Sequence, residues 1–192
     1  EPTTALDVTT QIEVLASIRE IVETEDRVRR DGLPVTEDGL RALKMMGFST
    51  PILARTGMAG EFGRRGFRNV TEMEPGDSRQ VGGVRVEAVH AEHKGFGPPV
   101  GGTDLCLGFI MHGTHSIYFA GDTGWGPHFQ QARTRFGPMR LAFLPIGGHF
   151  TMDPPAAARA VELLGCATVV PIHYGTFPVL AGTPDQLREE LE

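Results

Sequence analysis

Apolar segments of strand length alternate with a segment of helix length in the second half of the chain. The segments "LAFLPI" (141–146) and "TVVPI" (168–172) flank an alanine-rich stretch at 154–164. Upstream, "VRVEAV" (84–89) alternates in polarity, and the apolar "LCLGFIM" (105–111) and "SIYFA" (116–120) are separated by a turn at Gly113. This alternation is typical of layered structure in which helices cover apolar strands. We therefore predict an α/β fold.

The first quarter of the chain has a different pattern. Apolar residues recur at helical spacing from about 10 to 30, and a second helix is expected from about 36 to 46. A strand at 51–54, a helix at about 56–65 and a strand at 68–71 follow, and the Gly- and Pro-rich stretch 95–104 predicts a long loop. The length of 192 residues suits one domain over 1–192, in which 1–48 form an atypical helical segment.

Polar side chains with metal-binding chemistry follow the predicted strands. "SIYFAGD" ends on Asp122, "LAFLPIGGH" on His149 and "TVVPIH" on His173, while "VRVEAVHAEH" finishes on His90 and His93. Strand ends in layered α/β folds bring side chains to a common cleft. Imidazole and carboxylate are natural ligands of borderline divalent metals, so the pattern is compatible with a metal hydrolase.

Simpler explanations exist for each of these residues taken singly. Asp122, followed by Thr123 and Gly124, is also compatible with an Asx turn, and a histidine at a strand end is commonly a hydrogen-bonded surface residue. Three further histidines lack any such context, and we predict that they lie on the surface: His112, His115 and His128.

Composition narrows the functional classes. The 18 Lys and Arg residues are outnumbered by 24 Asp and Glu, for a net charge of -6, which argues against a nucleic-acid-binding surface. No apolar run approaches the roughly 20 residues of a membrane span, and the chain opens with no signal-peptide pattern. Cys106 and Cys166 lie in apolar surroundings without metal-type spacing, which predicts reduced thiols in a cytoplasmic protein.

Four segments together resemble the metallo-β-lactamase superfamily: "RRGFRNVTEMEPGDSRQVGGVRVEAVHAEH", "IYFAGDTGWGPHF", "RFGPMRLAFLPIGGHFTMDPPAAARAVELLG" and "VVPIHYGTFP". The branch that they most resemble includes ascorbate-phosphate lactonase-like and N-acylphosphatidylethanolamine phospholipase D-like proteins. The resemblance implies an αββα sandwich. It also implies that Asp122 bridges two metal ions, that His173 and His93 each bind one of them, and that His149 lines the cleft facing substrate. His93 is preferred to His90 because Ala91 stands two residues before it, as in family members.

The chain departs from this family in its N-terminal region. The family signature His-x-His-x-Asp-His is absent, since the first histidine is His90. The stretch where the signature is expected, "VETEDRVRRDGLPVTEDGL", contains only carboxylates as candidate ligands. The candidate substitutes are Glu23, Glu25, Asp26, Glu37 and Asp38. The predicted N-terminal helix also takes the place of expected strands, so we predict a fold whose N-terminal strand region is missing or replaced.

Two classes of function follow from these observations. The first is a metal-dependent hydrolase that uses a metal-activated water on a small ester, lactone or phosphodiester, with zinc as the expected metal and manganese or iron as alternatives. The second is a non-catalytic relative or rearranged fragment that serves as a binding or association module. Missing N-terminal strands would expose a sheet edge. We therefore predict a homodimer, in which the apolar side of the helix at 10–30 helps to cover that edge.

Overall fold

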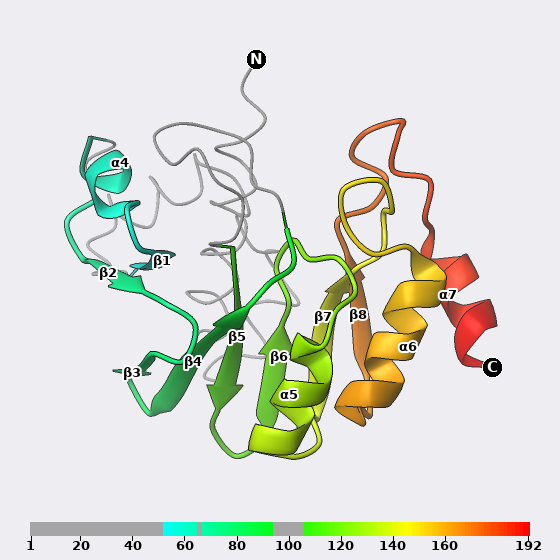
Figure 1. Ribbon diagram of the computed structural model, residues 1–192, viewed down its shortest axis with the longest axis horizontal. Helices are drawn as coiled ribbons and strands as arrows, with labels where there is room; N and C mark the ends of the chain where they lie inside the picture. The colour runs from blue at the N-terminus through cyan, green and yellow to red at the C-terminus, as the bar shows by residue number, and fades with distance from the viewer. Residues whose placement is uncertain (1–51, 65–66, 94–105) are drawn as a thin grey trace, which may run out of the picture. The chain divides into compact units, whose positions relative to one another are not determined.

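The computed structural model describes residues 52–64, 67–93 and 106–192 (Figure 1). The chain divides into two compact units, the first comprising 1–73 with 97–100 and the second 74–96 with 101–192. The predicted helices at 10–30 and 36–46, the replaced N-terminal strand region and the predicted loop at 95–104 lie outside the described residues. The prediction of a single domain over 1–192 stays a prediction.

The described part of the first unit is a small α/β motif. Strand β1 (Ile52–Arg55) pairs in parallel with β2 (Val70–Met73), and helix α4 (Ala59–Arg64) connects them. The carboxylate of Glu72 accepts hydrogen bonds from the backbone N–H groups of Gly57 and Ala59, at 2.9 and 2.7 Å, and so satisfies donors at the start of α4. The predicted strand at 51–54 and helix at 56–65 are confirmed, whereas the strand predicted at 68–71 begins at Val70.

The second unit is built on a six-stranded sheet in the order β3-β4-β5-β6-β7-β8. Its strands are β3 (Ser78–Val81), β4 (Val84–His90), β5 (Leu107–His112), β6 (Ser116–Phe119), β7 (Leu141–Pro145) and β8 (Val169–Ile172). The pairs from β3 to β6 are antiparallel, and those from β6 to β8 are parallel. The carboxyl ends of β6, β7 and β8 therefore lie at one edge of the sheet.

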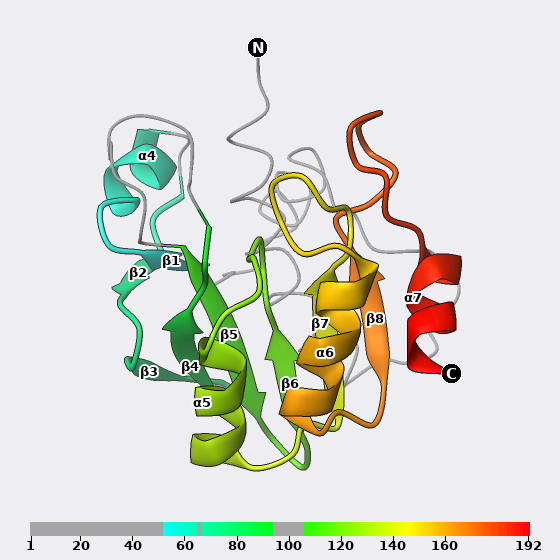
Figure 2. The ribbon, with the colours of Figure 1, turned by 45° about the vertical axis from the view of Figure 1, so that its right-hand side comes forward.

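Three helices pack on the second unit: α5 (His128–Phe136), α6 (Pro154–Leu164) and α7 (Pro184–Leu191). Figures 1 and 2 show α5 and α6 along one face of the sheet, with α7 beside α6. Their apolar side chains form one core with Ile110, Tyr118, Ala142 and Leu144 of the sheet. The opposite face is also buried, because the alternate residues Ala88, Phe109 and Phe119 are at most 2% exposed. The predicted layered α/β structure is confirmed.

The ends of the helices follow local capping chemistry. Asp153 caps α6 by accepting a hydrogen bond from the Ala156 N–H at 2.9 Å, and Gly165 ends the helix with left-handed backbone. Thr183 and Gln186 form a capping box at the start of α7. The described residues contain no helix that is long and apolar enough to span a membrane.

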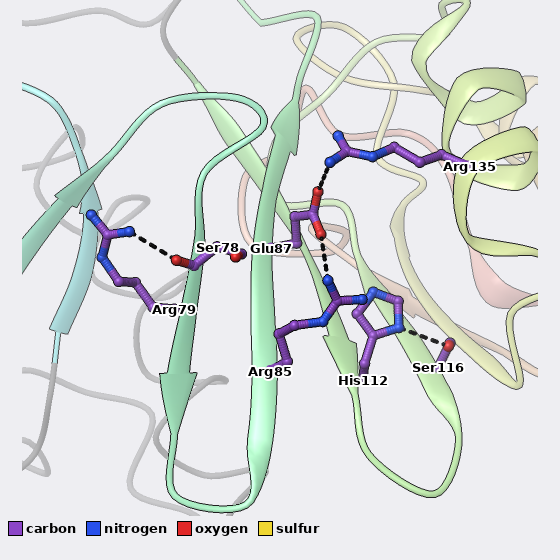
Figure 3. Close-up of polar contacts among 7 residues, drawn as sticks. All are labelled: Ser78, Arg79, Arg85, Glu87, His112, Ser116 and Arg135. Atoms are coloured by element: carbon purple, nitrogen blue, oxygen red, sulfur yellow. Dashed lines mark hydrogen bonds and ion pairs between the residues drawn. The ribbon is translucent and has the colours of Figure 1, made fainter.

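An ion-pair cluster around one buried carboxylate joins α5 to the sheet (Figure 3). Glu87, on the helix-covered face of β4, is 1% exposed and is ion-paired with Arg135 of α5 and with Arg85, whose guanidinium lies 3.4 Å away. On the adjacent strands, the Nδ1 of His112 lies 3.0 Å from the hydroxyl of Ser116. Burial and the nearby Arg85 lower the pKa of His112. Charge pairing satisfies a carboxylate that would otherwise be costly to bury.

The structure differs from the predicted pattern at several points. Strand β3 and helices α5 and α7 were not predicted from the sequence. The prediction that His128 lies on the surface is wrong, because this first residue of α5 is only 4% exposed. His112 is half-buried rather than on the surface, while His115 is exposed as predicted. Neither Cys106 nor Cys166 forms a disulfide within the described residues.

Candidate metal centre

Three of the predicted site residues follow the parallel strands of the second unit. Asp122 lies three residues after the end of β6, His149 four residues after β7, and His173 directly after β8. Because these strands are parallel neighbours, their carboxyl ends place the three loops side by side. A hydrogen bond of 3.0 Å from the Met152 N–H to the Thr123 carbonyl joins two of these loops. The topology thus brings the predicted strand ends to one edge.

Asp122 and His173 face each other at this edge. The Oδ2 of Asp122 lies 3.7 Å from the Nε2 of His173, and Asp122 is 7% exposed. Zinc bonds to carboxylate oxygen and imidazole nitrogen are about 2.0–2.2 Å long, so two atoms that share one ion lie at most about 4.2 Å apart. The observed separation is longer than a direct hydrogen bond and short enough for both atoms to bind one ion.

Left-handed backbone distinguishes two of the predicted residues. His149 has φ 57° and His173 has φ 52°, and within the described ranges all other residues with positive φ are glycines. An L-residue in this region costs about 1–2 kcal/mol, and such strain concentrates at functional sites. The two strained residues are therefore both ones that the sequence analysis predicted as site residues.

Close backbone packing requires glycine beside this strained turn. A Cβ atom added to Gly147 would lie 2.3 Å from the carbonyl oxygen of His173. Any side chain at position 147 would therefore displace the turn that carries His173. The "GG" before His149 serves this contact as well as the turn itself.

His93 lies just beyond the end of β4, and one nitrogen of its ring is hydrogen-bonded to the backbone. The Nδ1 of His93 is 3.2 Å from the carbonyl oxygen of Phe150, in the loop after β7. A carbonyl can only accept, so Nδ1 carries the proton, and in the neutral ring Nε2 then has the lone pair. Metal-binding histidines commonly donate their second nitrogen to a backbone carbonyl in this way. His93 has the tautomer that a ligand binding through Nε2 requires.

His149 and His90 make other contacts. His149 is exposed, and its ring contacts the Phe150 ring edge-on at a centroid distance of 4.2 Å. His90 lies with its Nε2 3.4 Å from the carboxylate of Glu92, and its ring meets the His128 ring edge-on at 6.0 Å. The contacts described for this part of the chain do not join either histidine to the Asp122–His173 pair.

Two buried polar residues next to the pair were missed from the sequence, Thr123 and His128. Thr123 is fully buried, and its hydroxyl lies 3.2 Å from the Nε2 of His128. Burial, with a smaller effect of His90, lowers the pKa of His128 to about 4. The position of Thr123 directly after Asp122 was an available signal, whereas nothing in the sequence indicates that His128 is buried.

The donor set fits a divalent metal in type but is incomplete in number. Catalytic zinc normally has three protein ligands. Asp122 and His173 supply two donor atoms, and within residues 52–64, 67–93 and 106–192 no group of three or more His, Cys, Asp or Glu could hold an ion.

Comparison with known proteins identifies the family of the chain. The Beta-lactamase superfamily domain matches residues 38–174, which include Asp122, His149 and His173. The chain belongs to the beta-lactamase superfamily. The predicted resemblance to that superfamily is confirmed, while the predicted branch within it stays a prediction.

Several named relatives share substantial sequence identity with the chain. A UPF0173 metal-dependent hydrolase from Anaeromyxobacter dehalogenans is 44% identical over 126 residues, covering 61% of this chain and 45% of the relative. Another from Koribacter versatilis is 38% identical over 135 residues, covering 67% and 57%. The chain spans about half the length of the curated relatives it matches.

Solved structures support the fold. The metallo hydrolase Igni18 from Ignicoccus hospitalis matches with a TM-score of 0.67 at 26% identity, covering 80% of this chain and 65% of that one. The metallo-beta-lactamase fold protein YhfI from Bacillus subtilis matches with a TM-score of 0.60 at 17% identity, covering 80% and 63%. The predicted metallo-β-lactamase-like α/β fold is confirmed.

Proposed function

We propose that the chain carries part of a metal-dependent hydrolase centre in which Asp122, His173 and His93 are protein ligands. The observation that carries the proposal is the Asp122–His173 pair, whose 3.7 Å separation suits one shared ion at a strained strand end. Zinc is the expected metal, with manganese or iron as alternatives, because the donors are imidazole and carboxylate. The names of the relatives, metal-dependent hydrolases, support the same assignment.

A bound divalent ion would lower the pKa of its water to about 7 and polarise a substrate carbonyl or phosphoryl oxygen. The residues of the chain then have separate tasks. Asp122, which is nearly buried, would bind the ion and orient the attacking water. His173, whose backbone is left-handed, would bind the ion through the Nε2 that faces Asp122.

The substrate that we propose is a small ester, lactone or phosphodiester. His149, exposed in the loop after β7, would face this substrate. Exposed aromatic rings follow each of the three strand ends, at Trp125, Phe150 and Tyr174, which are 50%, 46% and 39% exposed. They offer apolar contact to the organic part of such a molecule. The unbridged cysteines Cys106 and Cys166 suit the reducing cytoplasm, which is the compartment that we propose.

Hydrolysis of p-nitrophenyl acetate, a simple lactone and bis(p-nitrophenyl) phosphate tests the proposal. We expect metal-dependent turnover of at least one of them, and its loss in Asp122→Ala. His115→Ala is the matched control, because His115 is exposed at the turn before β6, at the opposite end of that strand from Asp122. Unchanged turnover in Asp122→Ala would overturn the proposal.

A second candidate is a non-catalytic association module, and the limited donor set favours it. Among the described residues only Asp122 and His173 are shown within reach of one ion, where three ligands per ion are the norm. Strand β8 is an end strand of the described sheet, although Pro171 removes one backbone donor from it. This candidate predicts a homodimer by light scattering and no bound metal; a monomer that carries near-stoichiometric metal would contradict it.

A further inference from the structure

The hydroxyl of Thr123 joins the loop after β6 to the end of β4. It accepts a hydrogen bond from the Glu92 N–H at 2.9 Å and donates one to the Gly124 carbonyl at 2.9 Å. The Gly124 N–H in turn donates to the Glu92 carbonyl at 2.6 Å. Glu92 directly precedes His93, and Thr123 directly follows Asp122. These bonds therefore clamp together the two backbone segments that carry the proposed ligands Asp122 and His93.

The hydrogen bonds of the Thr123 hydroxyl make His128 a donor to it. The single hydroxyl proton of Thr123 is directed to the Gly124 carbonyl, so the contact of 3.2 Å with the Nε2 of His128 requires a proton on that nitrogen. His128 then donates to Thr123, and the hydroxyl accepts two bonds and donates one. The low pKa of His128, about 4, keeps the ring neutral near pH 7. Its Nδ1 is buried and has no hydrogen-bond partner within the described part of the chain.

The packing around His128 leaves its ring little freedom. A Cβ atom on Gly126 would lie 2.9 Å from the Nδ1 of His128 and 2.8 Å from the Cγ of Glu92. The ring also contacts that of Phe129 at a centroid distance of 4.1 Å. A buried ring confined in this way is suited to hold a hydroxyl in one orientation.

We propose that His128 is a positioning residue for the metal centre, which acts by holding the Thr123 hydroxyl that clamps the Asp122 loop to the His93 strand end. This inference rests on the proposed function, since the clamp matters only if both side chains bind metal. Residues that orient metal ligands typically change metal affinity by about 10–100-fold when they are replaced. His128 and Thr123 touch no metal or substrate themselves in this account.

Two matched pairs of substitutions test the clamp. Thr123→Val keeps the shape but removes the hydroxyl, leaving the donors of Glu92 and His128 without their acceptor, whereas Thr123→Ser keeps the hydroxyl. His128→Phe keeps a ring but removes the donor, whereas His128→Gln can donate from its side-chain amide. The measurement is the zinc dissociation constant of the full chain, by competition with a chromophoric chelator, under conditions where circular dichroism shows each variant folded.

We expect Thr123→Val and His128→Phe to weaken zinc binding about 10–100-fold, with Thr123→Ser and His128→Gln remaining near wild type. The visible spectrum of bound cobalt should shift in the first two variants, because the ligands around the ion would be re-aimed. If Thr123→Val does not fold, the His128 pair and the cobalt spectra decide.

Different failures separate this inference from the proposed function. If the wild-type chain binds no zinc, the proposed function and the inference both fall. If wild type binds zinc and Thr123→Val or His128→Phe binds it equally well with an unchanged cobalt spectrum, the inference alone is overturned. Equal weakening in all four variants would also overturn it, because the effect would then come from packing rather than from the hydrogen bonds.

Discussion

Two nearly buried carboxylates in the second unit have opposite surroundings. Glu87 is 1% exposed and is paired with the guanidinium groups of Arg85 and Arg135, between β4 and α5 (Figure 3). Asp122 is 7% exposed and faces the imidazole of His173 across 3.7 Å at a strained strand end. Permanent positive charge neutralises the first carboxylate. The second faces the imidazole of a proposed metal ligand, so the difference separates a structural ion pair from a candidate chemical site.

The largest expected effect is on the rate of hydrolysis, which should depend on Asp122 and not on Glu87. Asp122→Asn keeps the size of the side chain but removes its charge and one oxygen donor, so we expect it to abolish metal-dependent hydrolysis. Glu87→Gln makes the same chemical change in the other site and should leave the rate within about twofold, because Glu87 belongs to a structural ion-pair cluster and is not a proposed metal ligand. Steady-state rates on the responsive ester, lactone or phosphodiester measure both. Equal loss in the two variants would remove the distinction.

The next largest effect is that His128 lowers the free energy of unfolding as the pH falls. Its folded pKa of about 4 lies below its ordinary value of 6.5, so protonation favours the unfolded chain. The stabilising contribution is complete above pH 6.5 and is lost as the pH falls toward 4, by about 3 kcal/mol. Urea unfolding between pH 7 and pH 4 should show a smaller decline for His128→Gln than for wild type. Parallel declines would contradict the assignment.

A smaller effect tests the structural role of Glu87. Glu87→Gln should lower the free energy of unfolding by about 2 kcal/mol, because a buried charge-assisted contact is lost. The cost stays below that of a fully buried pair, since the side chains of Arg85 and Arg135 are 51% and 57% exposed. Urea unfolding gives the value.

The control for Glu87 is a surface pair of the same type. Asp185 and Arg188 form an ion pair of 2.8 Å on α7 with both side chains mostly exposed. Asp185→Asn should change the free energy of unfolding by no more than about 0.5 kcal/mol. An equal loss from Asp185→Asn and Glu87→Gln would show that burial does not set the effect.

The smallest effect concerns backbone strain. His149 has φ 57°, a conformation that glycine adopts freely, so His149→Gly should raise the free energy of unfolding by about 1 kcal/mol. His149→Ala removes the same ring while keeping the strain, and it should show no such gain. Thermal unfolding of the two variants compares them directly. A gain in both would assign the effect to the lost ring.

The sequence predicted the parts of the site that depend on strand order. Asp122, His149 and His173 were identified because each follows an apolar run, and parallel pairing of β6, β7 and β8 brings such ends to one edge. The geometry beyond the strand ends was not predictable. Whether His149 or His173 faces the Asp122 carboxylate depends on turns whose positive φ no pattern of apolar residues encodes.

Two helices and one buried ion pair were missed from the sequence for different reasons. Helix α5 begins at His128 without a side-chain cap, and its buried residues are few, so its periodicity is weak. Helix α7 carries a capping box and Pro184 at its start, a signal that "TPDQ" does contain. The burial of Glu87 depends on Arg135, which lies 48 residues away on another element.

The central claim is that Asp122 and His173 hold a metal ion. Its most direct test is the metal content per chain, by plasma mass spectrometry on protein purified without chelator or affinity tag, for wild type, Asp122→Ala, His173→Ala and His115→Ala. The account predicts near-stoichiometric zinc, manganese or iron in wild type and His115→Ala, and loss of that metal in the other two. Metal at background in wild type, or undiminished in Asp122→Ala and His173→Ala, would contradict the account.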